Sequence, residues 1–143
     1  METVHIREES LKRKIEMDWS KYPNFSKEEF DCKHTGKNEM KPEFMQKLQD
    51  LRDAYGKPMS ISSGFRDKTH PIEAKKKRPG AHYSGMAADV RVDRGDAYGL
   101  LKIALELGFT GIGIQQKGSG RFIHLDTIPN GHEGFVRPTI WSY

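Results

Sequence analysis

The chain contains two segments in which apolar residues recur every three or four positions. This spacing predicts amphipathic helices over residues 42–55 and 96–107. Pro42 suits the first position of the first helix, and a glycine follows each helix as a stop, at Gly56 and Gly108. We therefore expect these two segments to form the main helices of the fold.

Four shorter segments have the pattern of β-strands. Residues 58–63 alternate between apolar and polar positions, and residues 87–92 form a second apolar run. Residues 111–114 and 122–126 are predicted to pair as a hairpin, because the glycine-rich residues 117–120 between them suit a tight connection. Adjacent antiparallel strands with helices segregated around them predict an α+β fold, a single domain with a small antiparallel sheet flanked by helices.

The beginning of the chain is more highly charged than the rest. Residues 1–24 contain scattered apolar positions, and the spacing of Leu11 and Ile15 allows a short helix there. Residues 25–30 have the pattern of a capped helical turn. We therefore expect an N-terminal extension over residues 1–24 and the folded domain over residues 25–143.

Composition excludes several classes of protein. The single cysteine, Cys32, rules out an internal disulfide and a multi-thiolate zinc site. No segment approaches the roughly 20 apolar residues that span a bilayer, and residues 1–5 lack the apolar core of a signal peptide.

The net charge of +4 suggests an anionic partner. Nucleic acid is an unlikely one, because the basic run over residues 75–78 has no interleaved aromatic residues for base stacking.

Two of the six histidines lie in patterns that suit a metal site. His82 precedes a predicted strand in which Ala87 and Asp89 face the same side, and the small alanine leaves space beside the carboxylate. His124 shares one strand face with Asp126. Two histidines and a carboxylate with an open fourth position are the ligand set of a catalytic zinc site. A purely structural role for these histidines stays open on the residues alone.

A candidate substrate-binding residue follows the first predicted strand. Arg66 comes directly after Ser62-Ser63-Gly64-Phe65, where its planar guanidinium is well placed to bind a carboxylate or a carbonyl oxygen. The alternative on local sequence is an ordinary surface arginine.

Taken together, these motifs resemble the zinc-dependent D-alanyl-D-alanine carboxypeptidase and endopeptidase family. These are peptidoglycan-cleaving peptidases that share a fold with the hedgehog signalling domain. The most specific motif is His-x-x-Gly-x-Ala-x-Asp, present at residues 82–89, and the final His-x-Asp motif is present at residues 124–126. The resemblance runs from about Phe25 to Tyr143, and it looks closest to the compact branch found in phage lysins.

The resemblance implies a hedgehog/DD-peptidase-like fold that binds one Zn²⁺ ion per chain. It implies that the metal ligands are His82, Asp89 and His124. It also implies substrate contacts, for which the candidate residues are Arg66, Ser63 and Tyr83.

The sequence departs from the family pattern at three positions. Gly80 stands where a serine often precedes the first ligand, and Pro71 stands where an asparagine is common. Many relatives place the catalytic acid three residues before the last histidine, and here that position is Arg121, which cannot act as a base.

The general base must therefore be sought elsewhere. Asp126 shares a strand face with His124, so it is either the catalytic base or a residue that orients a histidine through its other ring nitrogen. More distant alternatives for the base are His132 and Glu133.

We expect a zinc metallopeptidase that hydrolyses stem peptides or cross-links of peptidoglycan. It would act as a monomer in cell-wall lysis or remodelling, for example as a phage endolysin, made in the cytoplasm without a signal peptide. It would reach the wall after release or as part of a virion. The rival expectation is a catalytically inert zinc-containing module that binds the cell wall or a protein.

Overall fold

The computed structural model describes residues 17–143. The expected helix around Leu11 and Ile15 lies outside the described residues. Trp19–Lys21 form a short 3-10 helix, η1, and the Tyr22 side chain that follows it is buried in the main hydrophobic core. The expected division of the chain at residue 25 stays a prediction.

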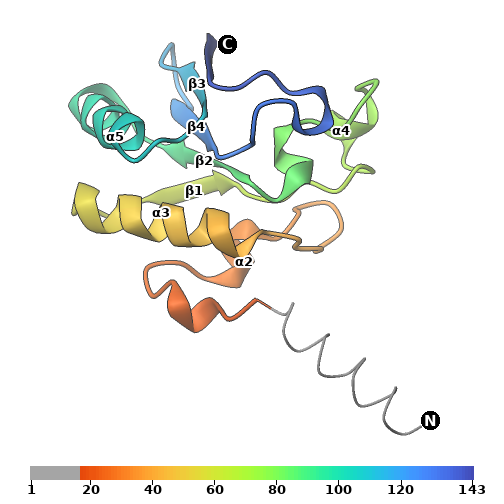
Figure 1. The fold of residues 1–143 in the computed structure, drawn as a ribbon, viewed down its shortest axis with the longest axis horizontal. Coiled ribbons are helices and arrows are strands. Elements are labelled where there is room, and N and C mark those ends of the chain that lie inside the picture. The colour runs from red at the N-terminus through yellow and green to blue at the C-terminus, as the bar shows by residue number, and fades with distance from the viewer. Residues whose placement is uncertain (1–16) are drawn as a thin grey trace, which may run out of the picture.

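A five-stranded mixed sheet forms the centre of the domain (Figure 1). Its strand order is β1-β2-β4-β3-β5, with bounds Ser60–Ser63 (β1), Ala87–Arg91 (β2), Gly111–Gln115 (β3), Phe122–Asp126 (β4) and Thr139–Ser142 (β5). The first four strands pair with one another in antiparallel fashion, as the sequence predicted, and the α+β class is confirmed. The sheet is mixed and not purely antiparallel as expected, because β5 pairs in parallel with β3.

The two predicted helices are present as α3 (Pro42–Tyr55) and α5 (Arg94–Glu106). Both contribute buried side chains to one core with the strands, and Figure 1 shows α3 running alongside the sheet. A capped turn, α2 (Lys27–Phe30), precedes them, with the backbone N–H of Ser26 donating to the Glu29 carboxylate at 2.8 Å. No helix within residues 17–143 has the length and apolar character needed to cross a membrane.

Residues 66–81 are polar and contain Pro71, Pro79 and Gly80, which predicts a loop, but two short helical turns lie in this segment and at its end. These are α4 (Pro71–Ala74) and the 3-10 turn η2 (Ala81–Ser84), and a third turn, η3 (His132–Gly134), follows the last antiparallel strand. Turns of three or four residues are too short to show a helical period in the sequence. Here they matter because η2 carries one of the candidate metal ligands.

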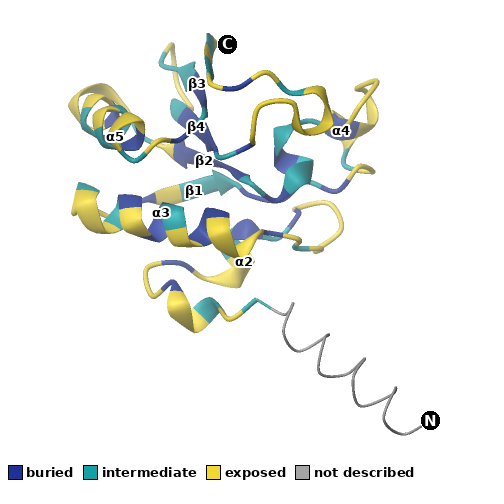
Figure 2. Ribbon diagram, viewed as in Figure 1, coloured by how far each residue is buried: buried dark blue, intermediate teal, exposed yellow. Residues whose placement is uncertain are grey.

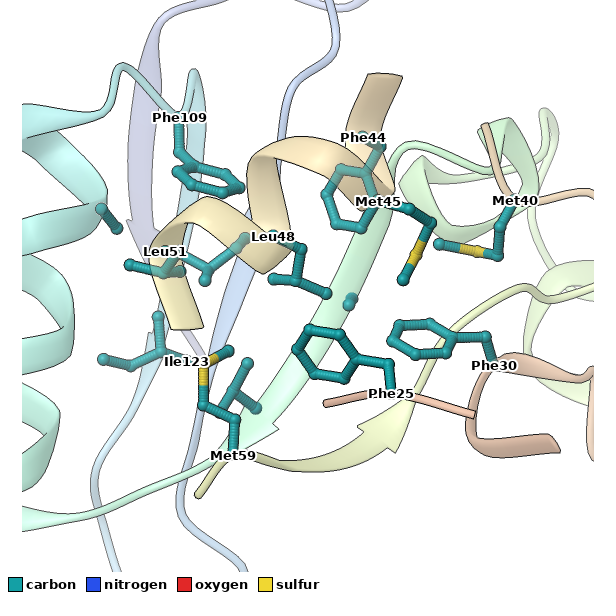
Figure 3. Close-up of a cluster of buried hydrophobic side chains, with 14 of the residues drawn as sticks. Phe25, Phe30, Met40, Phe44, Met45, Leu48, Leu51, Met59, Phe109 and Ile123 are labelled. Atoms are coloured by element: carbon teal, nitrogen blue, oxygen red, sulfur yellow. The ribbon is translucent and has the colours of Figure 1, made fainter. Parts of the chain in front are cut away.

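The strands have one apolar face and one polar face. Side chains such as Ala88, Val90 and Ile123 are buried against α3 and α5, where Figure 3 shows Ile123 near Leu51. The intervening strand residues project to the opposite face, because successive side chains alternate across a sheet. Figure 2 shows that the strands themselves are largely buried while the outer faces of the helices are exposed. The functional candidates on β2 and β4 therefore share the face that α3 and α5 leave open.

Candidate metal centre

Three buried side chains converge on this polar face of the sheet. Nε2 of His82 lies 3.1 Å from Oδ1 of Asp89, and Nδ1 of His124 lies 3.0 Å from that oxygen and 3.3 Å from the His82 nitrogen. Asp89 and His124 are directly opposite each other in the β2–β4 ladder, and η2 places His82 beside them. The structure thus brings together the three residues that the sequence suggested as zinc ligands.

The hydrogen-bond partners of the two histidines decide which ring nitrogens carry protons. Nδ1 of His82 lies 2.8 Å from the carbonyl oxygen of Gly64, which only accepts, so this nitrogen donates and Nε2 carries a lone pair. Nε2 of His124 lies 2.8 Å from the carboxylate of Asp126, so the lone pair of the neutral ring is on Nδ1. Two nitrogen lone pairs and the Asp89 oxygen therefore face one another.

This arrangement fits a zinc ion. Three acceptor atoms packed together repel one another unless a cation lies between them. Two ligand atoms that each lie about 2.0–2.1 Å from one tetrahedral zinc ion are about 3.3 Å apart. The separations of 3.0–3.3 Å in the structure are close to that value. The donor set of two imidazoles and one carboxylate also leaves a tetrahedral position open for catalysis.

Asp126 lies behind His124 and has no exposed surface. Its Oδ2 accepts hydrogen bonds from His124 Nε2 and Arg137 Nη2, both at 2.8 Å. Its Oδ1 accepts from Arg137 Nε at 2.9 Å and from the backbone N–H of Ile128 at 3.3 Å. The carboxylate therefore faces the side of the imidazole that points away from Asp89. This geometry favours the orienting role for Asp126 over the base role.

Both buried carboxylates of the site are held in their charged form. Burial alone would raise the pKa of Asp89, but its contacts with His82 and His124 hold that pKa well below its usual range. Burial likewise opposes ionisation of Asp126, and hydrogen bonds from His124 and Arg137 outweigh it and lower the pKa. Asp89 is therefore charged and able to bind a cation, and Asp126 is charged and accepts the hydrogen bond from Nε2 of His124.

Two glycines of β3 make room for this arrangement. A side chain on Gly111 would overlap the carboxylate of Asp126, and a Cβ on Gly113 would lie 2.6 Å from Nε1 of Trp141. The Trp141 ring occupies the space over Gly113 and lies with its centroid 5.0 Å from that of the His124 ring. The two glycines of Gly111-Ile112-Gly113 thus let the Asp126 carboxylate and the Trp141 ring pack directly against the backbone of β3.

A cavity of about 620 Å³ opens beside the metal-binding atoms. Its lining includes all three candidate ligands. Among the described residues that line it, Asp89 is the only carboxylate. The charged or hydroxyl-bearing side chains that join the ligands in this lining are Arg66, Lys76, Arg137 and Tyr143.

Of the three predicted substrate-binding residues, Arg66 lines the cavity beside the metal-binding atoms, whereas Ser63 and Tyr83 do not. Arg66 lines this cavity, with Nη2 3.7 Å from Oδ2 of Asp89. Ser63 supports it from behind, since its hydroxyl accepts a hydrogen bond from Arg66 Nε at 3.1 Å. Tyr83 lies outside the lining, next to Phe65 and in the wall of a neighbouring cavity of about 350 Å³.

His132 and Glu133, the more distant candidates for a base, also line the neighbouring cavity. Neither belongs to the lining of the cavity beside the metal-binding atoms. The described structure therefore does not bring them into the candidate centre.

Sequence reasoning missed Arg137, whose buried guanidinium forms a two-pronged contact with Asp126. It lies in the connection to β5, with no periodic pattern around it to mark it as functional. The signal that could have identified it is the buried carboxylate itself, since such a group requires a positive partner.

Comparison with models of protein families identifies a match. A family model described as peptidase M15 matches residues 23–126, a span that contains all three candidate metal ligands and Arg66. Arg137 and β5 lie beyond the matched span. A search of curated proteins finds no match.

Proposed function

Because the chain belongs to the peptidase M15 family, a family of zinc peptidases of the D-alanyl-D-alanine carboxypeptidase type, we propose that it hydrolyses peptide bonds in the stem peptides or cross-links of peptidoglycan. The observation that carries the proposal is the convergence of two histidine lone pairs and one carboxylate oxygen beside an open cavity. A structural zinc site is closed by protein ligands, whereas a catalytic one keeps a position free.

We assign the zinc ion to His82, Asp89 and His124. When bound there, zinc supplies a Lewis acid that polarises a carbonyl oxygen and makes water a better nucleophile at neutral pH. The contacts of the histidines with Gly64 and Asp126 support this assignment, because they fix each ring with its lone pair toward Asp89.

Arg66 is the proposed substrate-binding residue. Its guanidinium lines the cavity, with Nη2 3.7 Å from Oδ2 of Asp89, while its Nε donates to the hydroxyl of Ser63. From this position it would bind the carboxylate or the developing oxyanion of the substrate. Ser63 acts in this proposal by orienting Arg66.

The basic run over residues 75–78 follows α4, and Lys76 within it lines the cavity. We propose that this run attracts the anionic cell wall, an effect that salt would weaken because exposed charges are screened. In keeping with this substrate, the protein would act on the wall after release from the cytoplasm, as a phage endolysin does, or as part of a virion.

A zinc-containing binding module without catalytic activity is the second candidate. Two observations favour it. Arg121 stands where many relatives place a catalytic acid, and Asp89 is the only carboxylate among the described residues that line the cavity. Such a module would bind zinc as the peptidase does but would not cleave its ligand.

Digestion of purified peptidoglycan tests these two candidates. The zinc-loaded protein is expected to reduce the turbidity of the wall suspension, and a chelator is expected to abolish this loss until zinc is restored. Mass spectrometry of the released fragments identifies the bond that is cleaved. His124→Ala should remove both zinc and activity, whereas His34→Ala, at an exposed histidine, should retain both. Zinc binding without any cleavage would favour the binding module.

A further inference from the structure

One buried carboxylate near the metal centre has no place in the proposed function so far. Glu73 belongs to α4, in the segment that the sequence indicated as a loop, and its side chain has no exposed surface. Its Oε2 accepts a hydrogen bond from the backbone N–H of Gly80 at 2.7 Å. Its Oε1 lies 3.1 Å from Nζ of Lys76 and 3.6 Å from Nη1 of Arg66. Glu73 therefore connects three parts of the cavity wall.

The first connection holds the arginine. Glu73 contacts one terminal nitrogen of Arg66 while Asp89 lies near the other, at 3.7 Å. If Asp89 binds zinc, its charge is shared with the metal, and Glu73 becomes the principal counter-charge of the guanidinium. A planar guanidinium keeps its orientation only when its donors have fixed acceptors. The Glu73 contact thus sets how Arg66 faces the cavity.

The second connection holds the turn that carries a metal ligand. Gly80 is the N-cap residue immediately before η2, and its carbonyl accepts a hydrogen bond from the backbone N–H of Tyr83 in that turn. His82 lies in the same turn. By accepting the Gly80 N–H, Glu73 fixes the start of η2 relative to α4.

Glu73 is charged in spite of its burial. Burial alone would raise its pKa, but the Gly80 N–H and the Lys76 ammonium outweigh this effect and lower it. A buried carboxylate in its charged form requires such partners. Its contacts go to Arg66, to Lys76 and to the turn of His82.

We propose that Glu73 is a positioning residue of the peptidase, which orients Arg66 toward the substrate and fixes the turn that presents His82. This inference rests on the proposed function for its catalytic consequence. The contacts themselves do not depend on it.

Two substitutions separate the two connections. In Glu73→Gln the amide oxygen can still accept the Gly80 N–H, but the charge facing Arg66 and Lys76 is lost. We expect zinc affinity to stay within about threefold of the wild type and kcat to fall at least about tenfold. In Glu73→Ala both connections are lost, so zinc affinity should also fall, by at least about tenfold. Zinc affinity is measured by competition with a chelator, and kcat and KM are measured on zinc-saturated protein.

A double-mutant cycle with Arg66→Lys tests whether Glu73 acts through the arginine. If it does, Glu73→Gln should add no more than about a twofold loss to the Arg66→Lys variant. Lys76→Met, combined with Glu73→Gln, tests the alternative that Glu73 only neutralises the lysine. Restored activity in that double variant would overturn the role assigned to Arg66. Glu106→Gln, on the exposed face of α5, is the matched control and should be unchanged.

The NMR signal of the Arg66 Nη1–H group, which is the group nearest Glu73, gives a readout that needs no turnover. We expect this signal to be sharp and slowly exchanging in the wild type and to broaden in Glu73→Gln. If the wild type cleaves no peptidoglycan while the signal still depends on Glu73, the proposed function fails and the positioning of Arg66 stands. An unchanged signal in Glu73→Gln, full activity in that variant, or multiplicative losses in the cycle would each overturn the inference.

Discussion

At the scale of single residues, the candidate centre depends on which atoms are left without protons. Burial alone would lower the pKa of His124, but hydrogen bonds with Asp126 and Asp89 outweigh it and raise the pKa, so a proton competes with a metal ion for Nδ1 of this ring. The Asp126 carboxylate keeps a proton on Nε2 and so leaves Nδ1 for a metal. Arg137 in turn fixes that carboxylate with two hydrogen bonds. The orientation of one ligand thus depends on two residues that do not touch the metal-binding atoms.

The first prediction concerns Asp126→Asn. An amide in place of the carboxylate removes the negative charge that holds the proton of His124. We expect zinc affinity to fall by about 10–100-fold and excess zinc to restore much of the activity. The measurement is a zinc titration paired with peptidoglycan digestion at low and high zinc. Near-normal zinc affinity with turnover reduced by about 10²–10⁴ would instead identify Asp126 as the general base.

The second prediction concerns Arg137→Lys. Lysine keeps the positive charge but cannot reproduce the two-pronged contact with Asp126. We expect a loss of about 1–3 kcal/mol in the free energy of unfolding, because a buried acceptor loses a partner, together with weaker zinc binding. Denaturant unfolding and a zinc titration check this. Arg52→Lys, in the last turn of α3, is the control. Equal stability and zinc affinity in Arg137→Lys and the wild type would show that the contact does not position Asp126.

At the scale of elements, the registers of β2, β4 and β3 place the site. In the antiparallel ladders His124 is opposite Asp89 on one side and Gly113 on the other, and Asp126 is opposite Gly111. One neighbouring strand thus supplies a ligand, and the other supplies space. The polar face of the sheet can hold a buried carboxylate and an indole ring because β3 contributes no side chains at these two positions.

The third prediction compares two glycine-to-alanine substitutions. In Gly111→Ala the new methyl group would overlap Asp126, so we expect loss of stability by about 1–3 kcal/mol from overpacking and weaker zinc binding. Gly99 lies in α5 with no atom near the position of its Cβ, so Gly99→Ala should be neutral or stabilising by up to about 1 kcal/mol. Thermal unfolding of both variants measures the difference. A Gly111→Ala protein as stable as Gly99→Ala would mean that Asp126 can move without cost.

At the scale of the whole molecule, the candidate zinc site joins segments that are distant in the sequence. His82 and His124 are separated by 42 positions, and they lie on a 3-10 turn and a central strand. The apolar core lies on the other face of the sheet and contains none of the three candidate ligands. A bound ion would nevertheless stabilise the native state, because the unfolded chain does not hold these ligands together.

The fourth prediction follows from this linkage. Free zinc at about 1,000 times its dissociation constant should stabilise the fold by about 4 kcal/mol, and this raises the melting temperature on the order of 10 °C. Removal of zinc by a chelator should reverse the shift while the secondary structure is retained below the transition. Calorimetry with and without zinc measures it. His124→Ala should show no such shift, and a zinc-induced shift of full size in that variant would place the metal elsewhere.

Local sequence patterns determined the regular elements and the candidate ligands. The period of apolar residues was sufficient for α3 and α5, because it reflects contacts with one core. Alternation at residues 58–63, an apolar run at residues 87–92 and the glycine-rich connection at residues 117–120 were sufficient for the four antiparallel strands. The motif at residues 82–89 and the one at residues 124–126 suggested the metal ligands, and the fold brings them together.

Only the tertiary structure decided what surrounds those ligands. The parallel pairing of β5, the contact of Arg137 with Asp126 and the burial of Glu73 join residues from separate loops and short turns. The fold also places Tyr83, a predicted substrate-binding residue, in the wall of a neighbouring cavity. Buried polar partners are selected by charge and distance in the folded chain, and no periodic pattern records such partners when they lie in irregular segments.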